Sequence, residues 1–155
     1  MAISGTYSDG DAIQMNNCEV EVDLTPASSL FANVDSWSTE ITSTDEQVNT
    51  SEACTFTHTG PIVFAGNPQP VTVTTTCVYT EGTTDPYHNI KSASLGGLMD
   101  VRWGPAGAGS GGKAFTTSGG LLVRRSLPQG NAEGTNPVVF SWDVRCSSVS
   151  MGTIA

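Results

Sequence analysis

The residue types that carry acid–base or metal chemistry are scarce in this sequence, and their spacing forms no known motif. The two histidines are His58 and His88, and Asp85 precedes His88 by three residues on a predicted helix, where the two side chains could touch. A hydrolase would also need an activated nucleophile and an oxyanion-stabilising group. Neither GxSxG nor HExxH occurs in the sequence. We therefore predict no catalytic residues, no metal site and no cofactor, and expect that the protein is not an enzyme.

A glycine-rich stretch from Gly107 to Gly112 matches the letters GxGxxG of the dinucleotide-binding fingerprint. That fingerprint needs a helix to begin at the last glycine, so that the helix N-terminus meets the pyrophosphate. The residues that follow, Lys113-Ala-Phe-Thr-Thr117, have the pattern of a strand. The stretch therefore predicts a mobile loop and no cofactor site.

The four cysteines form no CxxC pair, which argues against a zinc site. The first residues lack the basic and apolar regions of a secretory signal, and no apolar run is long enough for a membrane span. We therefore expect synthesis in the cytoplasm, four thiols and no membrane partner. If the finished protein works outside the cell, the pairings to test are Cys18–Cys146 and Cys54–Cys77, because each would join strands that we expect to be neighbours.

The elements that must position these residues are mostly β-strands. The 155 residues include 20 Thr, 17 Ser and 17 Gly, whereas only 14% are charged. Thr favours strands and Gly favours turns, so the composition predicts an all-β protein. We expect an N-terminal arm at residues 1–17 and a single β domain at residues 18–155.

Two strands are the most clearly patterned. The segment Cys18–Leu24 alternates, with Glu19, Glu21 and Asp23 on one face and apolar residues on the other, which is typical of a half-buried strand with one acidic face. The segment Val71–Glu81 is dense in Val and Thr. Further strands are expected at 36–42, 53–59, 98–103, 113–117, 120–127 and 138–149, with loops at 43–52 and 65–70.

One short helix is expected at about 86–94. Asp85 suits the N-cap position, Pro86 suits the first helical position, and Gly96-Gly97 ends the helix.

Charge is unevenly distributed along the chain. Residues 1–90 contain 12 carboxylates and no basic residue, whereas residues 91–155 contain six basic and three acidic residues. This layout favours a protein with an acidic face and a more basic face, which can steer identical subunits head-to-tail. Arg124 and Arg125 are adjacent on a strand and so point to opposite faces. Either could meet an acidic neighbour across a subunit contact, or both could simply be solvated. If such pairs hold the subunits together, added salt should weaken assembly.

The order of these elements resembles the major tail (tail tube) protein of long-tailed bacteriophages. The acidic strand Cys18–Leu24 is followed by a Trp-containing strand beginning near Asp35-Ser36-Trp37, a polar loop and the Val/Thr strand. A short helix, the segment Val101-Arg-Trp-Gly-Pro105, the glycine-rich loop and a closing pair of strands come next. The resemblance extends over nearly the whole chain.

The resemblance implies a β-sandwich or barrel with one flanking helix, assembled into hexameric rings. Inner strands would join into one barrel around a lumen, and stacked rings would conduct the DNA genome without binding it specifically. Glu19, Glu21 and Asp23 are the candidate lumen-facing carboxylates, because carboxylates repel phosphate. The partners would be other copies of the chain, the tape measure protein and the tail terminator. The location would be the virion tail, assembled in the host cytoplasm.

Two other classes of protein fit the same composition. A capsid decoration protein, or another β-protein of the virion, would form trimers without a lumen. A receptor- or carbohydrate-binding β-sandwich would gather exposed aromatic residues in one groove, but aromatic residues make up only 7% of this chain.

Overall fold

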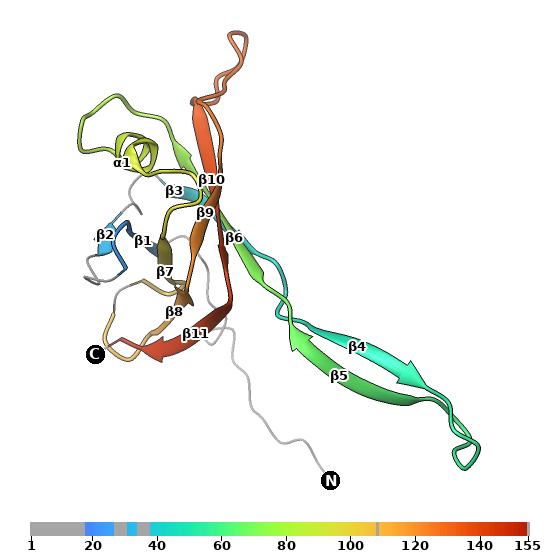
Figure 1. Cartoon of the computed structure of the whole chain (residues 1–155). Helices are drawn as coiled ribbons and strands as arrows, with labels where there is room; N and C mark the ends of the chain where they lie inside the picture. The colour runs from blue at the N-terminus through green and yellow to red at the C-terminus, as the bar shows by residue number, and fades with distance from the viewer. Residues whose placement is uncertain (1–17, 27–30, 34–37, 108, 155) are drawn as a thin grey trace.

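The computed structural model describes residues 18–26, 31–33, 38–107 and 109–154. Within them the chain forms two packed antiparallel sheets, a projecting two-stranded ribbon and one short helix (Figure 1). The predicted mostly-β fold with a single short helix is confirmed.

The strands are β1 (Glu19–Asp23), β2 (Phe31–Asn33), β3 (Ser38–Ser43), β4 (Val48–Ala53), β5 (Ile62–Pro68), β6 (Val71–Val78), β7 (Asp100–Gly104), β8 (Lys113–Ser118), β9 (Leu121–Arg125), β10 (Val139–Cys146) and β11 (Ser148–Thr153), and the helix is α1 (Pro86–Ser92). The expected arm at residues 1–17 lies outside the described residues.

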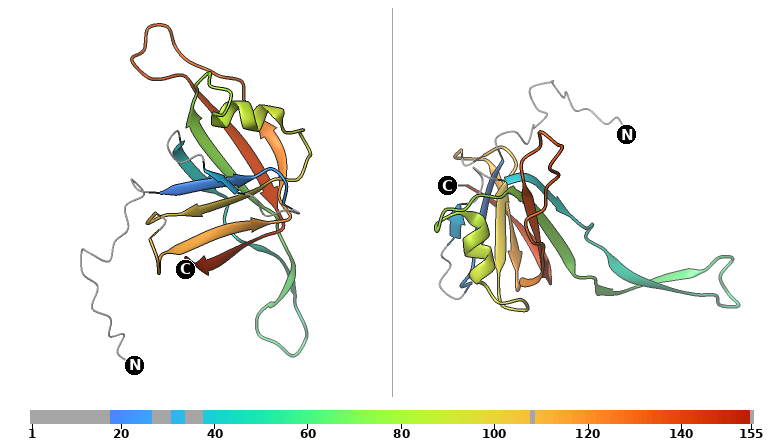
Figure 2. Two further views of the ribbon diagram at one scale, coloured as in Figure 1. Left: turned by 90° about the vertical axis from the view of Figure 1, so that its left-hand side faces the viewer. Right: turned by 90° about the horizontal axis from the view of Figure 1, so that it is seen from above.

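The two main sheets have different widths. One contains five strands in the order β11-β8-β7-β1-β2, and the other contains four in the order β3-β6-β10-β9. Every pairing in both sheets is antiparallel. Figure 2 shows the two sheets facing each other, with α1 near one end of the sandwich.

The core forms because alternate residues of each long strand point inward. Burial in β6 and β10 alternates with a period of two, which is the period of side chains along a strand. Trp142 and Phe140 of β10 stack with ring centroids 5.5 Å apart, and they are the largest fully buried side chains. The apolar core residues come from both sheets and the helix region: Val20, Val22, Val71, Val73, Cys77, Ile90, Met99, Val101, Leu122, Phe140, Trp142, Val144 and Cys146.

Helix α1 begins as predicted, with Asp85 at the N-cap position and Pro86 in the first turn. It ends at Ser92, two residues before the predicted end. Ile90 anchors it in the core, and the ring of Tyr87 lies edge-on between the rings of Tyr79 and Phe140. The helix therefore covers the core at one end of the sandwich.

The prediction was wrong for three segments between residues 43 and 70. The expected loop at 43–52 contains most of β4, the expected strand at 53–59 is mostly turn and irregular structure, and the expected loop at 65–70 contains most of β5. Together β4 and β5 form a long hairpin that projects from the sandwich (Figures 1 and 2). Both faces of the hairpin are exposed along almost its whole length. No buried face therefore imposes the apolar alternation by which a strand is recognised in a sequence.

Candidate assembly surfaces

The residues considered for catalysis are not brought together. His58 lies in the hairpin turn, where its Nδ1 is 2.8 Å from the hydroxyl of Thr55, whereas His88 is exposed on α1. The carboxylate of Asp85 accepts a hydrogen bond from the amide of Gly82. The described residues contain no group of three or more His, Cys, Asp or Glu that could hold a metal ion. No helix among them is long and apolar enough to cross a membrane. The glycine-rich segment is followed by strand β8, as expected.

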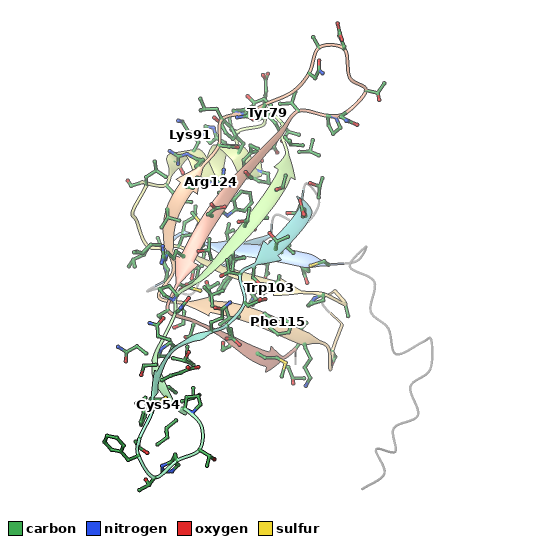
Figure 3. The ribbon with its side chains drawn as sticks, turned by 90° about the vertical axis from the view of Figure 1, so that its right-hand side faces the viewer. Cys54, Tyr79, Lys91, Trp103, Phe115 and Arg124 are labelled. Atoms are coloured by element: carbon green, nitrogen blue, oxygen red, sulfur yellow. The ribbon has the colours of Figure 1, made fainter. Side chains whose placement is uncertain are left out.

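The hairpin of β4 and β5 forms the first exposed surface. Cys54 lies far from the sandwich in Figure 3. Phe56 is fully exposed at 111% of its reference area, and three further large apolar side chains of the hairpin are at least 48% exposed: Val48, Val63 and Phe64. Residues 45–68 also contain three carboxylates and no basic residue. The hairpin is thus an apolar and acidic projection that makes few contacts with its own subunit.

The solvent-facing side of the four-stranded sheet is lined by hydroxyls, and we name it the hydroxyl face. Its side chains alternate with the core residues of β6 and β10 and continue onto β3. The hydroxyl residues are Thr42, Thr72, Thr74, Thr76 and Ser141. Four charged side chains complete the face: Glu40, Arg124, Asp143 and Arg145.

On the hydroxyl face, Arg124 and Asp143 form a bidentate ion pair. The Nε of Arg124 donates to Oδ2 of Asp143 at 2.6 Å, and its second nitrogen donates to Oδ1 at 2.9 Å. Thr74 also donates a hydrogen bond to Oδ1 at 2.8 Å. Partial burial opposes ionisation of Asp143, but the hydrogen bonds from Arg124 and Thr74 outweigh it and hold the pKa of Asp143 below its ordinary value. The charge of Arg124 is therefore compensated inside its own subunit.

A second exposed apolar surface lies along the outer edge of β9, and we name it the β9 edge surface. It consists of Leu95, Leu98, Leu121 and Val123, which are between 39% and 59% exposed. The residues are held together because Leu98 and Leu121 are partners in an antiparallel bridge and Gly97 accepts a hydrogen bond from the amide of Leu122. Exposed apolar side chains that gather in this way mark contact surfaces more often than isolated ones do.

The three predicted acidic residues of β1 have different environments. Glu21 forms an ion pair with Arg102, whose Nε lies 2.6 Å from the carboxylate, and the guanidinium of Arg102 also lies over the ring of Phe31. Asp23 is only 1% exposed and accepts a hydrogen bond from the amide of Thr25. Glu19 is partly exposed. Asp23 therefore offers no carboxylate to solvent in the subunit, and the acidic face is weaker than its sequence suggests.

Arg125 has a role that its sequence context did not indicate. One of its guanidinium nitrogens donates to three backbone carbonyls at the end of α1, those of Ile90, Lys91 and Ala93, at 2.7 to 3.2 Å. These carbonyls have no partner within the helix, and a cation is favourable at this end of the helix dipole. Arg125 thus fixes the helix to β9.

The pairings Cys18–Cys146 and Cys54–Cys77, suggested for a protein that works outside the cell, stay predictions. Cys54, Cys77 and Cys146 are free thiols, and Cys54 is exposed on the hairpin whereas Cys77 is buried in β6. The cross-strand partners of Cys77 are Ser38 and Phe140. Burial raises the pKa of the Cys77 thiol to about 11. The Sγ of Cys146 donates to the carbonyl of Val71 at 3.4 Å, and burial likewise raises its pKa.

The acidic and the basic parts of the sequence meet in the five-stranded sheet. Strand β1 from the acidic part pairs directly with β7 from the basic part, so Glu21 lies opposite Arg102. Arg102, Arg124 and Arg125 are all bound within the subunit, and they are half of the six basic residues. Where β1 and β7 pair, charges of the two parts of the sequence therefore lie side by side.

Comparison with known proteins supports the fold. The sequence matches no protein-family model, and no curated protein matches it. The structure is similar to a chain in the extended PVC sheath–tube complex of an extracellular contractile injection system (TM-score 0.70, 15% identity, 96% of this chain and 100% of that chain). It is also similar to the tube-terminating cap of the anti-feeding prophage (TM-score 0.68, 16% identity, 99% and 96%). A chain from the tail of a gene transfer agent particle, refined with C6 symmetry, has TM-score 0.62 at 9% identity (93% and 100%). The chain therefore has the fold found in phage-tail-like tubes.

Proposed function

We propose that this protein is the repeating subunit of a tail tube, forming stacked hexameric rings around a lumen through which a DNA genome passes. The projecting hairpin is the observation that carries the proposal. A two-stranded ribbon is marginally stable in water by itself, and this one exposes four large apolar side chains. Such a ribbon is stabilised when it packs against another surface. A second copy of the same chain is always available as that partner in a homo-oligomer.

The hairpin and the sandwich lie at different ends of the subunit. This arrangement suits a heterologous contact. Figure 3 shows the hairpin with Cys54 at one end, and Tyr79 and the connection 127–137 at the other. A heterologous contact uses two different patches and can repeat without limit along an axis, as a tube requires. The similar proteins come from tube, terminator and tail particles, which supports the same architecture.

The net charge of −9 suits a conduit for DNA. A protein binds DNA non-specifically by releasing counterions from phosphates with its basic residues. Half of the basic residues here are bound to groups of the same subunit, so they are less available to phosphate. The remaining partners would be the tape measure protein and the tail terminator, and the location would be the virion tail, assembled in the host cytoplasm.

Electron microscopy of the purified protein tests the proposal. We expect closed six-membered discs or tubes with a central hole. Trimers without a lumen would instead indicate a capsid decoration protein, and a persistent monomer that binds glycans would indicate a receptor-binding β-sandwich. A tape measure gene next to the gene for this protein would support the tube independently.

A further inference from the structure

The two sheets of the sandwich part at one end and leave an open cleft, which we name the aromatic cleft. Its apolar wall belongs to the five-stranded sheet, and two carboxylates from the residues before the hairpin stand at its rim. The wall includes Trp103, Phe115, Val149 and Met151, and the rim carries Asp45 and Glu46. The cleft has a volume of about 570 Å³, which is ample for the side chain of a phenylalanine.

The strand register explains why aromatic rings face this cleft. Trp103 lies opposite Val20, a core residue, so its ring is on the inner side of the five-stranded sheet. Phe115 is the cross-strand partner of Trp103, and Met151 is the partner of Phe115. The three side chains therefore form one row on the inner side, and the two rings stack with centroids 5.5 Å apart.

This row stays partly open because the opposite sheet does not extend over it. Strand β3 ends at Ser43 and β6 begins at Val71, and between them the chain leaves the sandwich as the hairpin. Figure 3 shows Trp103 and Phe115 close together on the side of the sandwich from which the hairpin leaves. Both rings are only half-buried, and Met151 is 64% exposed. The apolar wall of the cleft is thus accessible to a partner.

The hairpin tip, residues 53–61, has chemistry that complements the aromatic cleft. Phe56 is fully exposed there, and the amide of His58 donates to the carbonyl of Thr55 at 3.4 Å, which closes the turn. The hydroxyls of Thr55 and Thr57 contact Nδ1 of His58 at 2.8 and 3.3 Å, which leaves Nε2 for a group outside the turn. The tip contains no carboxylate. It therefore offers an aromatic ring and an imidazole to a site that has aromatic rings and carboxylates.

The geometry of the hairpin directs its tip away from the cleft of its own subunit. Asp45 and Glu46 at the rim lie just before β4, at the base of the hairpin. At about 3.3 Å per residue, the chain from Glu46 to Phe56 spans roughly 30 Å. The pairing of β4 with β5 keeps the hairpin extended, and it points away from the sandwich (Figures 1 and 2). A domain of this length has a radius of gyration of about 15 Å, so the hairpin reaches as far as a neighbouring copy.

From these observations we infer that the hairpin tip of one subunit inserts Phe56 into the aromatic cleft of a second copy. The inference rests on the proposed function and names the surface that receives the hairpin. At the rim, the imidazole of His58 meets the carboxylates of Asp45 and Glu46. Every subunit has one tip and one cleft, so the contact is heterologous and repeats from copy to copy. The β9 edge surface suits the tip less well, because its four side chains are aliphatic and uncharged.

Cross-linking between copies tests the contact directly. Met151→Cys places a thiol on the wall of the aromatic cleft, and the native Cys54 lies two residues from Phe56. Residues two apart on a strand are separated by about 7 Å, which a short bis-maleimide spans. We expect this reagent to convert tubes of Met151→Cys into a ladder of linked chains on denaturing gels. The ladder forms because the two thiols of each subunit react with different neighbours.

Two controls give the ladder its meaning. Met151→Cys combined with Cys54→Ser should give no ladder. Leu121→Cys, which keeps Cys54 and places the second thiol at an exposed apolar residue of the β9 edge surface, should give none either. No ladder from tubes of Met151→Cys, or an equal ladder from Leu121→Cys, would overturn the inference while the tubes still support the proposed function. A wild type that forms neither rings nor tubes would reject the proposed function itself.

Charge reversal tests the rim without new thiols. His58→Glu sets a carboxylate against Asp45 and Glu46, and we expect the critical concentration for assembly to rise roughly 5-fold, the upper range for one exposed ion pair. Asp45→Lys and Glu46→Lys in the same chain should restore the wild-type value. His88→Glu makes the same substitution on α1 and should have no effect. All four side chains are exposed, so the fold should survive. A failure of the lysines to rescue His58→Glu, or an equal defect in His88→Glu, would overturn the pairing at the rim.

Discussion

Removing the hairpin should abolish assembly while preserving the fold. The amide of Gln69 already donates to the carbonyl of Gln47 at 2.8 Å, so the chain can be closed there. Replacing residues 48–68 by Asn-Gly supplies a two-residue turn whose twist suits this pairing. The deleted strands are almost entirely exposed, so little core is lost. A change in unfolding free energy of about 1 kcal/mol corresponds to a shift in Tm of about 2–4 °C in a domain of this size, and we expect no more.

The loss of assembly can be bounded from the exposed aromatic residues. Phe56 is fully exposed and Phe64 is 49% exposed. A phenylalanine buries about 150–250 Å², so complete burial of both on assembly removes roughly 300 Å² from water. At about 25 cal/mol per Å² this gives an upper bound of about 7.5 kcal/mol. If a third of this free energy, about 2.5 kcal/mol, remains after the cost of ordering the hairpin on assembly, its loss raises the critical concentration for assembly roughly 70-fold.

Sedimentation and negative-stain microscopy measure the critical concentration, and circular dichroism measures Tm. Phe56→Ala should reproduce part of the defect, whereas Thr57→Ala, in the same turn, should have none. The reasoning is refuted if the shortened protein forms tubes at the wild-type concentration, or if it fails to fold.

Three further predictions concern the subunit itself. Arg125→Ala should destabilise the fold by about 1–3 kcal/mol, because charged hydrogen bonds to the end of α1 are lost. Arg125→Lys should recover part of this stability in thermal unfolding. Equal Tm values for the wild type and both variants would contradict the capping role of Arg125. The pKa of Asp143 is lower in the folded state, so its carboxylate contributes stability that is present above the unfolded pKa of about 4 and is lost as pH falls through the lower folded value. Asp143→Asn should therefore flatten the acid limb of a curve of unfolding free energy against pH. An unchanged acid limb would exclude this contribution of Asp143. In the native protein at pH 8 a thiol reagent should modify Cys54 quickly, and Cys77 and Cys146 only after denaturation, because both are buried and their pKa values are raised; rapid reaction of either would contradict the described core.

The elements that sequence reasoning identified are those whose residues bury one face. Strand β6 alternates Val and Thr because the valines enter the core, and α1 is bounded by Asp85-Pro86 and by glycines. The hairpin was missed because nothing in its own subunit buries it, so its pattern carries no periodic signal. Segments that contact only another copy of the chain are therefore poorly predicted from sequence, although here such a segment carries the proposed function.

The roles of Arg124 and Arg125 could not be predicted from the sequence, for a related reason. A strand pattern shows that Arg124 and Arg125 point to opposite faces, and the structure agrees, since one binds Asp143 and the other binds the end of α1. The partners themselves come from residues that are 19 and 35 positions away along the chain. Whether an arginine serves a subunit contact or its own fold depends on such tertiary pairings.

The acidic strand β1 shows why a face pattern alone cannot locate a lumen. Alternation separates the core side of β1, with Val20 and Val22, from the side that carries Glu19 and Glu21, but Asp23 at the end of the strand is buried as well. It cannot say whether the sheet that contains β1 is the inner or the outer layer of an assembly. Which sheet faces a lumen depends on how neighbouring subunits pack, and the alternation of a single strand does not encode that contact.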